Sequence, residues 1–292
     1  MAVANTITTS TIYDKVLQDR LDHPTNWKEM CSVEYTDIGT ISSSYMSTTP
    51  SVQSGTRGTP AVLQVFAETA QTLAISTYRE LGVVVDLADL AQSDWTKPAE
   101  LFDRIGALLN EVIETAVLAR HASWTDFDNA AIGGAAGNIT VSASNIDDII
   151  RGVKREIREA NGQFLMNRNG VGFVWRAADF EYLEAFVQAN GFMTADKALK
   201  EGTVEGIRYL GVDHYWSNDN ATNHVMAGVK KVERLGILSG TYGQAHTIDF
   251  PGSDTNSTGS SFFSGKAFYS RADFGHLTPF AHSSTLFDVN VA

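Results

Sequence analysis

The sequence predicts an α+β fold in which an α/β block is inserted into a unit built from a sheet and one long helix. Three observations predict it. Thirteen of the twenty-eight residues from Ser32 to Thr59 are Ser or Thr, and few of the others are large enough to pack a core. After Pro98, apolar residues recur at helical spacing for about 25 residues, the only pattern of that length in the chain. After Ser144, short helix and strand patterns alternate.

The N-terminal third is predicted to extend away from the rest of the chain. Residues 1–31 form an arm with one short amphipathic helix, Ile12–Leu21. Two extended runs, Val33–Ile38 and Ala61–Phe66, flank Gly- and Pro-rich turn material and predict a long β-hairpin within residues 32–71. With about twenty residues on each side, this hairpin would reach ~60 Å, beyond the radius of one domain. We expect so long a segment without a core to become ordered on neighbouring molecules.

A strand and the long helix follow the hairpin. The β-branched run Leu81–Asp86 favours a strand that is buried on both faces. Thr96 can cap the next helix, and Pro98 suits its first turn because that position needs no N–H donor. The pattern predicts that the helix ends near His121. Its apolar face consists of Leu101, Ile105, Leu108, Leu109, Val112 and Ile113.

The inserted block begins after a linker, Ala130–Gly137. Ser144–Asp147 has the spacing of a capping box and predicts a helix that ends at Asn161 and Gly162. A strand over Val171–Arg176, a second helix and a glycine-spaced strand pair over Gly202–Val212 complete the block. The two helices have apolar stripes, formed by Ile146, Ile149, Ile150, Val153 and Ile157, and by Phe180, Leu183, Phe186 and Val187.

The C-terminal part returns to strand patterns. Val225–Leu238 and Phe262–Phe274 read as strands, and the polar loop Pro251–Ser261 separates them. Leu286–Ala292 predicts a further strand at a sheet edge. We therefore expect the chain to complete the sheet and long-helix unit here, around the inserted block.

Composition excludes several classes of protein. The 292 residues carry a formal net charge of -12, which argues against a protein that grips nucleic acid through a dense Lys/Arg surface. No apolar run approaches the ~18 residues of a membrane span, and the first residues lack a signal-peptide pattern. Cys31 is the only cysteine, so no disulfide can form within the chain. We expect a protein of the reducing cytoplasm that does not contact membranes.

One resemblance covers nearly the whole chain. Gly202–Gly206, Tyr209–Val212 and Tyr215–Asn218 follow the helix–strand–helix order of the block, and Ala227–Lys230 follows as a returning strand. In this order and pattern the sequence resembles the major capsid protein of tailed double-stranded DNA bacteriophages, the HK97-like fold. The resemblance implies an N-terminal arm (1–31), an extended loop or E-loop (32–71), a peripheral domain with a long spine helix (72–125 and 224–292), and an inserted axial domain (126–223).

The resemblance also implies a function. Such a protein is structural rather than enzymatic, needs no cofactor, and assembles with copies of itself into the hexamers and pentamers of an icosahedral head around the genome. Portal protein, separate scaffolding or decoration proteins and weakly bound double-stranded DNA would be its partners, in virions assembled in the host cytoplasm. Because no lysine lies between Lys28 and Lys97, covalent cross-linking through the E-loop is not expected. Only about thirty residues precede the hairpin, too few for a long scaffolding segment of its own.

Two sets of residues are candidates for contacts. Arg57 is the only charged residue between Thr40 and Gln64, so at a hairpin tip it could pair with a carboxylate of the next subunit. The candidate intersubunit contacts are Arg57, Tyr45, Met46 and Tyr13. Arg151, Lys154, Arg155 and Arg158 form a basic stripe at helical spacing. This stripe could contact packaged DNA or an acidic neighbour, but we favour a solvated face paired with Asp147 and Glu159.

Other motifs do not support catalysis. Gly259–Lys266 resembles a phosphate-binding loop, but it has one residue too many between its glycines and Ala267 in place of a metal-binding hydroxyl. Asp213, His214 and His224 lack the spacing of a zinc site, and we expect structural roles for them. Two alternatives remain open: an encapsulin-like compartment shell with the same fold, and a soluble enzyme whose site is assembled from distant residues.

Overall fold

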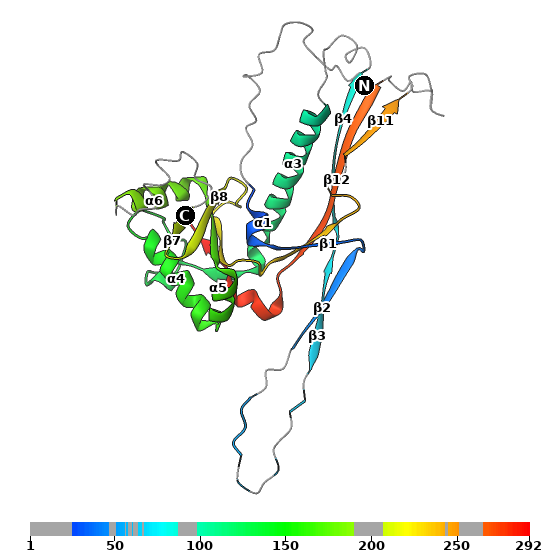
Figure 1. The fold of residues 1–292 in the computed structure, drawn as a ribbon. Coiled ribbons are helices and arrows are strands. Elements are labelled where there is room, and N and C mark those ends of the chain that lie inside the picture. The colour runs from blue at the N-terminus through cyan, green and yellow to red at the C-terminus, as the bar shows by residue number, and fades with distance from the viewer. Residues whose placement is uncertain are drawn as a thin grey trace.

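The computed structural model describes residues 25–46, 51–55, 57, 60, 64–65, 67–86, 98–189, 207–242, 245–250 and 265–292 (Figure 1). The predicted arm helix, the cap at Thr96 and the loop of residues 251–261 lie outside these ranges. The described chain forms two sheets, each with its own hydrophobic core, and a separate two-stranded ladder. No described helix has both the length and the apolar character to cross a bilayer.

The first sheet has five strands, and its longest strand joins the others. That strand, β12 (Gly265–Leu277), pairs antiparallel with β4 (Thr77–Asp86) along one side. Along its other side it pairs with β11 (Ala245–Phe250) and β10 (Arg234–Leu238), and β10 pairs in parallel with β1 (Ser32–Thr36). The sheet therefore unites strands from the beginning, middle and end of the chain.

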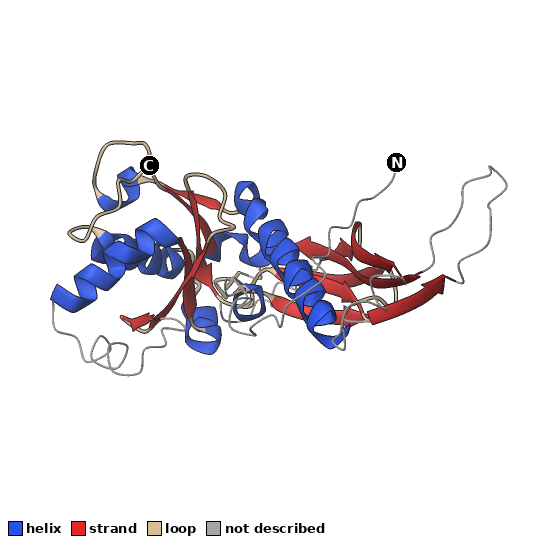
Figure 2. Cartoon of the chain, turned by 90° about the horizontal axis from the view of Figure 1, so that it is seen from above, coloured by secondary structure: helices blue, strands red, loops and turns tan. Residues whose placement is uncertain are grey.

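The predicted long helix packs on this sheet. It is the long helix that crosses the middle of Figure 2, α3 (Pro98–Leu118), and a 3₁₀ turn, η2 (Ala119–Ser123), follows it in the chain. Its buried stripe, together with Trp27 of the short helix α1 (Trp27–Met30), covers Leu235, Ile237 and Phe274 of the sheet. The stripe consists of Ile105, Leu109, Ile113 and Val117.

Two details of this unit differ from the predictions. Leu108, assigned to the apolar face, is 41% exposed, whereas Glu114 is buried and accepts hydrogen bonds from the backbone N–H groups of Asn26 and Trp27. The prediction that Leu81–Asp86 is buried on both faces is wrong for the side chains described there. Leu81 and Val83 are only partly buried and pack toward α3, while Gly82 on the opposite face is exposed, because α3 covers only one face of the strand here.

A β-hairpin projects from the first sheet (Figure 1). Its strands are β2 (Thr40–Met46) and β3 (Glu68–Ala74), paired antiparallel over seven residues from Thr40↔Ala74 to Met46↔Glu68. A hairpin is present as predicted, but the first predicted strand was wrong, and most of the second predicted run, Ala61–Phe66, lies outside the described residues. The run Val33–Ile38 contains β1, which joins the first sheet, because its parallel pairing with β10 satisfies its backbone groups.

The second sheet has six strands in the order β5-β13-β9-β6-β8-β7. Their bounds are β5 (Thr125–Phe127), β6 (Val171–Arg176), β7 (Ile207–Tyr209), β8 (Val212–Ser217), β9 (His224–Val229) and β13 (Leu286–Asn290). The prediction of an edge position for the C-terminal strand is wrong, because β13 hydrogen-bonds to β9 on one side and β5 on the other.

Two of the helices beside this sheet, α4 (Ile146–Glu159) and α6 (Ala177–Ala189), follow the predicted patterns, whereas α5 (Gln163–Asn169) was not predicted. The 3₁₀ turns beside the sheet are η3 (Asn129–Ile132) and η4 (Phe280–Thr285). All five isoleucine and valine residues of the α4 stripe are fully buried, and Phe180, Leu183 and Val187 of α6 are buried as well. Phe186 is partly buried and packs against the same core. Amphipathic periodicity was therefore a sound guide to the second core.

The start of α4 corrects one prediction. Ser144 does not act as the capping residue of a box with Asp147; the N-cap is Asn145. Its Oδ1 atom accepts a hydrogen bond from the backbone N–H of Ser142 at 2.9 Å, which is the reciprocal half of a capping box set two residues earlier. At the other end, Asn161 has a positive φ of 59°, as a helix-terminating residue often does.

The second sheet extends across the predicted domain boundary at residue 224. β9 and β13 belong to the C-terminal segment, yet they pair with β6 and β5 of the segment predicted to form the inserted domain. The hydrogen bonding is continuous there, so the division of the chain into domains stays a prediction.

Candidate functional site

The projecting hairpin is the first candidate site, because its described outer part has few partners within its own chain. Val52 and Val65 are fully or almost fully exposed, with relative exposures of 102% and 86%. Arg57 is exposed as well, and no hydrogen bond or ion pair to it is found within the described residues. Exposed apolar side chains on a projecting element mark a surface that can be covered by another chain.

The base of the hairpin is fixed to the first sheet. Leu73 of β3 is buried and packs over Gly236 of β10. A side chain at position 236 would overlap the Leu73 side chain. Gln71 donates to the carbonyl of Thr278 at 3.2 Å and accepts from the backbone N–H of Phe280 at 3.3 Å. These contacts set the direction in which the hairpin leaves the body.

An ion pair reinforces the same region. Arg234 on β10 donates three hydrogen bonds of 2.6–2.9 Å from Nε and Nη2 to the carboxylate of Glu34 on β1. Its Nη1 atom donates to Ser43 of β2 at 2.5 Å. One guanidinium therefore links the first sheet, its parallel edge strand and the hairpin. A planar donor with a fixed fork suits this role better than a lysine.

The other predicted contact residues are placed less fully. Tyr45 is half-buried on β2 opposite Thr69, and the backbone of Met46 pairs with Glu68. The side chain of Met46 and all of Tyr13 lie outside the described residues. The structure brings Arg57, Tyr45 and Met46 onto one projecting element, but their contacts with other subunits stay a prediction.

The basic stripe on α4 is largely paired within the chain. Arg151 bonds Asp147 at 2.8 Å, and Arg155 lies 3.0 Å from Glu156 and 3.7 Å from Glu159. Lys154 donates to the carbonyl oxygen of Leu210 at 2.6 Å, and partial burial lowers the pKa of its ammonium group. These are the pairs expected for a solvated face. Contact between the stripe and DNA stays untested.

The three residues considered as metal ligands are separated by the fold. Asp213 accepts from Lys230 at 2.5 Å and lies 3.6 Å from Arg208. His214 is fully buried, and its Nδ1 atom accepts a hydrogen bond from the indole N–H of Trp175 at 3.0 Å. Burial lowers the pKa of His214 to about 3, so this imidazole stays neutral. Asp213 and His214 therefore have the structural roles predicted for them.

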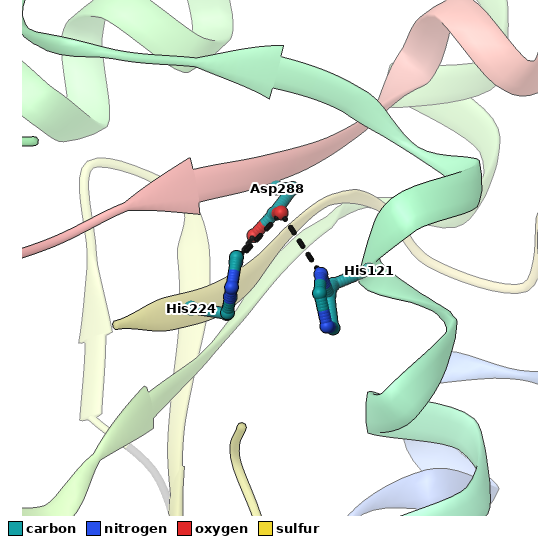
Figure 3. A group of neighbouring side chains, drawn as sticks. All are labelled: His121, His224 and Asp288. Atoms are coloured by element: carbon teal, nitrogen blue, oxygen red, sulfur yellow. Dashed lines mark hydrogen bonds and ion pairs between the residues drawn. The ribbon is translucent and has the colours of Figure 1, made fainter. Parts of the chain in front are cut away.

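His224 is different, because it belongs to a cluster that the sequence did not reveal. It bonds Asp288, which also lies 3.3 Å from His121 (Figure 3). The three residues are separated by more than sixty positions at each step and match no motif, so no spacing rule could have found them. They are the one group of three potential metal ligands found among the described residues.

Cys31, the single thiol, does not resemble a nucleophile. It is fully buried beneath α3, and burial raises the pKa of its thiol well above the ordinary value. A neutral, inaccessible thiol cannot attack a substrate. Its contacts are those of a small apolar core residue.

Comparison with solved structures shows which known proteins share this fold. A chain from Mycobacterium phage Che8 superposes with a TM-score of 0.69 at 14% identity, over 98% of each chain. A chain from the mature capsid of bacteriophage PhiM1 superposes with a TM-score of 0.62 at 14% identity, over 97% of this chain and 92% of that one. The capsid chain of a native GTA particle superposes with a TM-score of 0.61 at 12% identity, over 99% of this chain and 96% of that one.

The match spans nearly the full length of both partners in each case, so the mixed α/β fold described above is shared with the capsid chains of bacteriophage PhiM1 and of the GTA particle. No family model and no curated protein matches the sequence. At such low identity the likeness is one of backbone architecture.

Proposed function

We propose that this chain is the structural major capsid protein of a tailed bacteriophage, which assembles into the hexamers and pentamers of an icosahedral head around double-stranded DNA. One observation supports the proposal: the fold matches capsid chains along almost their entire length. A soluble enzyme has no evident need for the projecting hairpin, whereas a shell subunit does.

The HK97-like subdivision provides the finer assignment. Residues 1–31 are the arm, the E-loop covers residues 32–71 and includes β2 and β3, and α3 is the spine helix of the peripheral domain of residues 72–125 and 224–292. The axial domain comprises residues 126–223 with α4, α5 and α6. The presence of two separate cores supports a division into two domains.

The assembly mechanism follows from the exposed hairpin. Each subunit lays its hairpin on a neighbour, where Val52, Val65 and Arg57 find apolar and carboxylate partners. Individually weak contacts become a stable shell because every subunit makes several at once. The net charge of -12 opposes close packing of subunits, so added salt promotes assembly. The contacts are noncovalent, since no lysine lies in the hairpin.

Electron microscopy of the purified, untagged full-length protein tests the proposal directly. Negatively stained samples at several salt concentrations are expected to contain closed particles of uniform size. A small discrete oligomer under all conditions would contradict the proposal. Native particles that contain nuclease-resistant DNA would support a viral head, and particles that contain an enzyme would favour an encapsulin-like compartment.

A hairpin variant sharpens the test. Replacement of residues 47–67 by a short Gly-Ser turn removes the outer hairpin and keeps β2, β3 and the contacts at their base. We expect a subunit with an unchanged circular dichroism spectrum and no closed particles. If this variant still forms normal shells, the hairpin is not the assembly element.

A further inference from the structure

Three side chains from distant parts of the chain meet beside the second sheet. His121 lies in η2 at the end of the long helix, His224 is the first residue of β9, and Asp288 lies on β13 (Figure 3). The strand register explains the meeting of two of them. Asp288 is opposite Met226, so His224 lies two residues further along the same face, diagonal to Asp288. The end of the long helix brings His121 to this face.

Both imidazoles turn toward the same carboxylate (Figure 3). The Nδ1 atom of His224 lies 2.8 and 3.0 Å from the two oxygens of Asp288, and the Nδ1 atom of His121 lies 3.3 Å from Oδ2. The two rings stack with centroids 3.7 Å apart and planes inclined by 22°.

The cluster has the charge balance and spacing of a cation site. The Asp288 side chain is 3% exposed, and a buried carboxylate needs a compensating positive charge. Ligand atoms around a tetrahedral zinc ion, with bonds of ~2.0–2.1 Å, lie ~3.4 Å apart. The three ligand atoms here lie within 4.8 Å of one another, and the two rings would have to rotate out of their stack for both lone pairs to face one ion. The histidines are 26% and 28% exposed, which leaves one side open to water.

We propose that His121, His224 and Asp288 bind one divalent transition-metal ion of the zinc class, with water as the fourth ligand. Each ring carries its proton on Nε2 in this state, so the Nδ1 lone pair faces the ion. Two imidazoles and one carboxylate suit zinc and exclude magnesium and calcium, which prefer oxygen ligands. The bound ion ties the end of the long helix to β9 and β13 and so connects the two cores.

Metal content tests the proposal. The untagged full-length protein is treated with a chelator, dialysed against excess zinc chloride, freed of loose metal by gel filtration and analysed by mass spectrometry. We expect about one zinc per subunit and a higher Tm than in the chelated protein. Cobalt(II) in place of zinc should give the visible absorption bands of a nitrogen- and oxygen-ligated tetrahedral ion.

Substitutions assign the ligands. His121→Ala and His224→Ala should each weaken zinc binding by at least about tenfold. Loss of a residue that only hydrogen-bonds to a metal ligand already lowers metal affinity by about that factor. His282→Ala, which changes an exposed histidine outside the cluster, should bind as the unaltered protein does. If Asp288→Asn does not fold, His121→Gln still tests the site. His121 is partly exposed, so its replacement should not prevent folding.

Two results would overturn the inference: a zinc content near zero in the unaltered protein, or equal binding by His121→Ala. In either case the cluster is a hydrogen-bonded contact and nothing more. Shell formation is scored separately by microscopy, so failure of the metal site and failure of the proposed shell function are distinguishable.

Discussion

Acidification should destabilise the subunit through one buried histidine. His214 is fully buried on β8, and its Nδ1 atom accepts a hydrogen bond from Trp175. A protonated ring would point an N–H group at the indole N–H, donor against donor, inside an apolar core. Burial is the main cause that lowers the pKa of His214 from 6.5 to about 3.

The size of the effect follows from proton linkage. In the unfolded chain His214 takes up a proton near pH 6.5, while in the folded chain it does so only near pH 3. The stability is therefore complete above pH 6.5 and is lost as the pH falls from there toward 3. The loss approaches ~1.4 kcal/mol per pH unit, which amounts to about 2.5 kcal/mol between pH 7.5 and pH 4.5.

His214→Asn isolates this contribution, because its amide oxygen can accept from Trp175 in the same place and does not titrate. Urea unfolding of the unassembled subunit at both pH values gives the two free energies of unfolding. The unaltered protein should lose about 2.5 kcal/mol more than the variant, since all other titrating groups are shared. An equal loss in both, or a nuclear magnetic resonance titration of His214 near pH 6.5, would refute the reasoning.

Three substitutions test the hairpin and its anchorage. Gly275→Ala should cost at least about 2 kcal/mol of unfolding free energy, because its Cβ would overlap the carbonyl oxygen of Ala74 at the hairpin base. Arg234→Ala should cost about 1 kcal/mol, since it leaves the partly exposed Glu34 without its bidentate partner. Arg57→Ala should leave the subunit within ~0.5 kcal/mol of the unaltered protein but lower the urea concentration at which particles dissociate.

Matched variants control for the change of residue type. Gly240→Ala adds the same methyl group where no atom lies within 4 Å, so it should leave stability nearly unchanged. Arg168→Ala removes one exposed arginine from α5 and controls for the lost charge in Arg57→Ala. If Gly275→Ala unfolds like Gly240→Ala, the contact between the hairpin base and β12 is not as tight as described. If Arg57→Ala particles are as stable as the unaltered ones, the tip arginine has no interface role.

Periodicity in the sequence was enough to locate the main helices. The stripes of α3 and α4 recur every three or four residues; all five predicted positions of α4 are buried, as are Ile105, Leu109 and Ile113 of α3. The capping details and the exposure of Leu108 were not predicted. They depend on which residues lie nearby in the folded chain, and periodicity does not show this. The basic stripe was placed correctly on one helix and its pairs with Asp147 and Glu159 are present, since both residues lie one helical turn from an arginine.

The strands show most clearly which features the sequence determined and which only the tertiary structure decided. A helix closes its hydrogen bonds four residues away, so its own sequence determined α3, α4 and α6. A strand takes its partner from anywhere in the chain, and only the tertiary structure decided that β1 joins β10, that β13 is an interior strand and that His121, His224 and Asp288 meet. The physical reason is that strand pairing and side-chain clusters are satisfied at long range, where a single sequence carries no local trace of the partner.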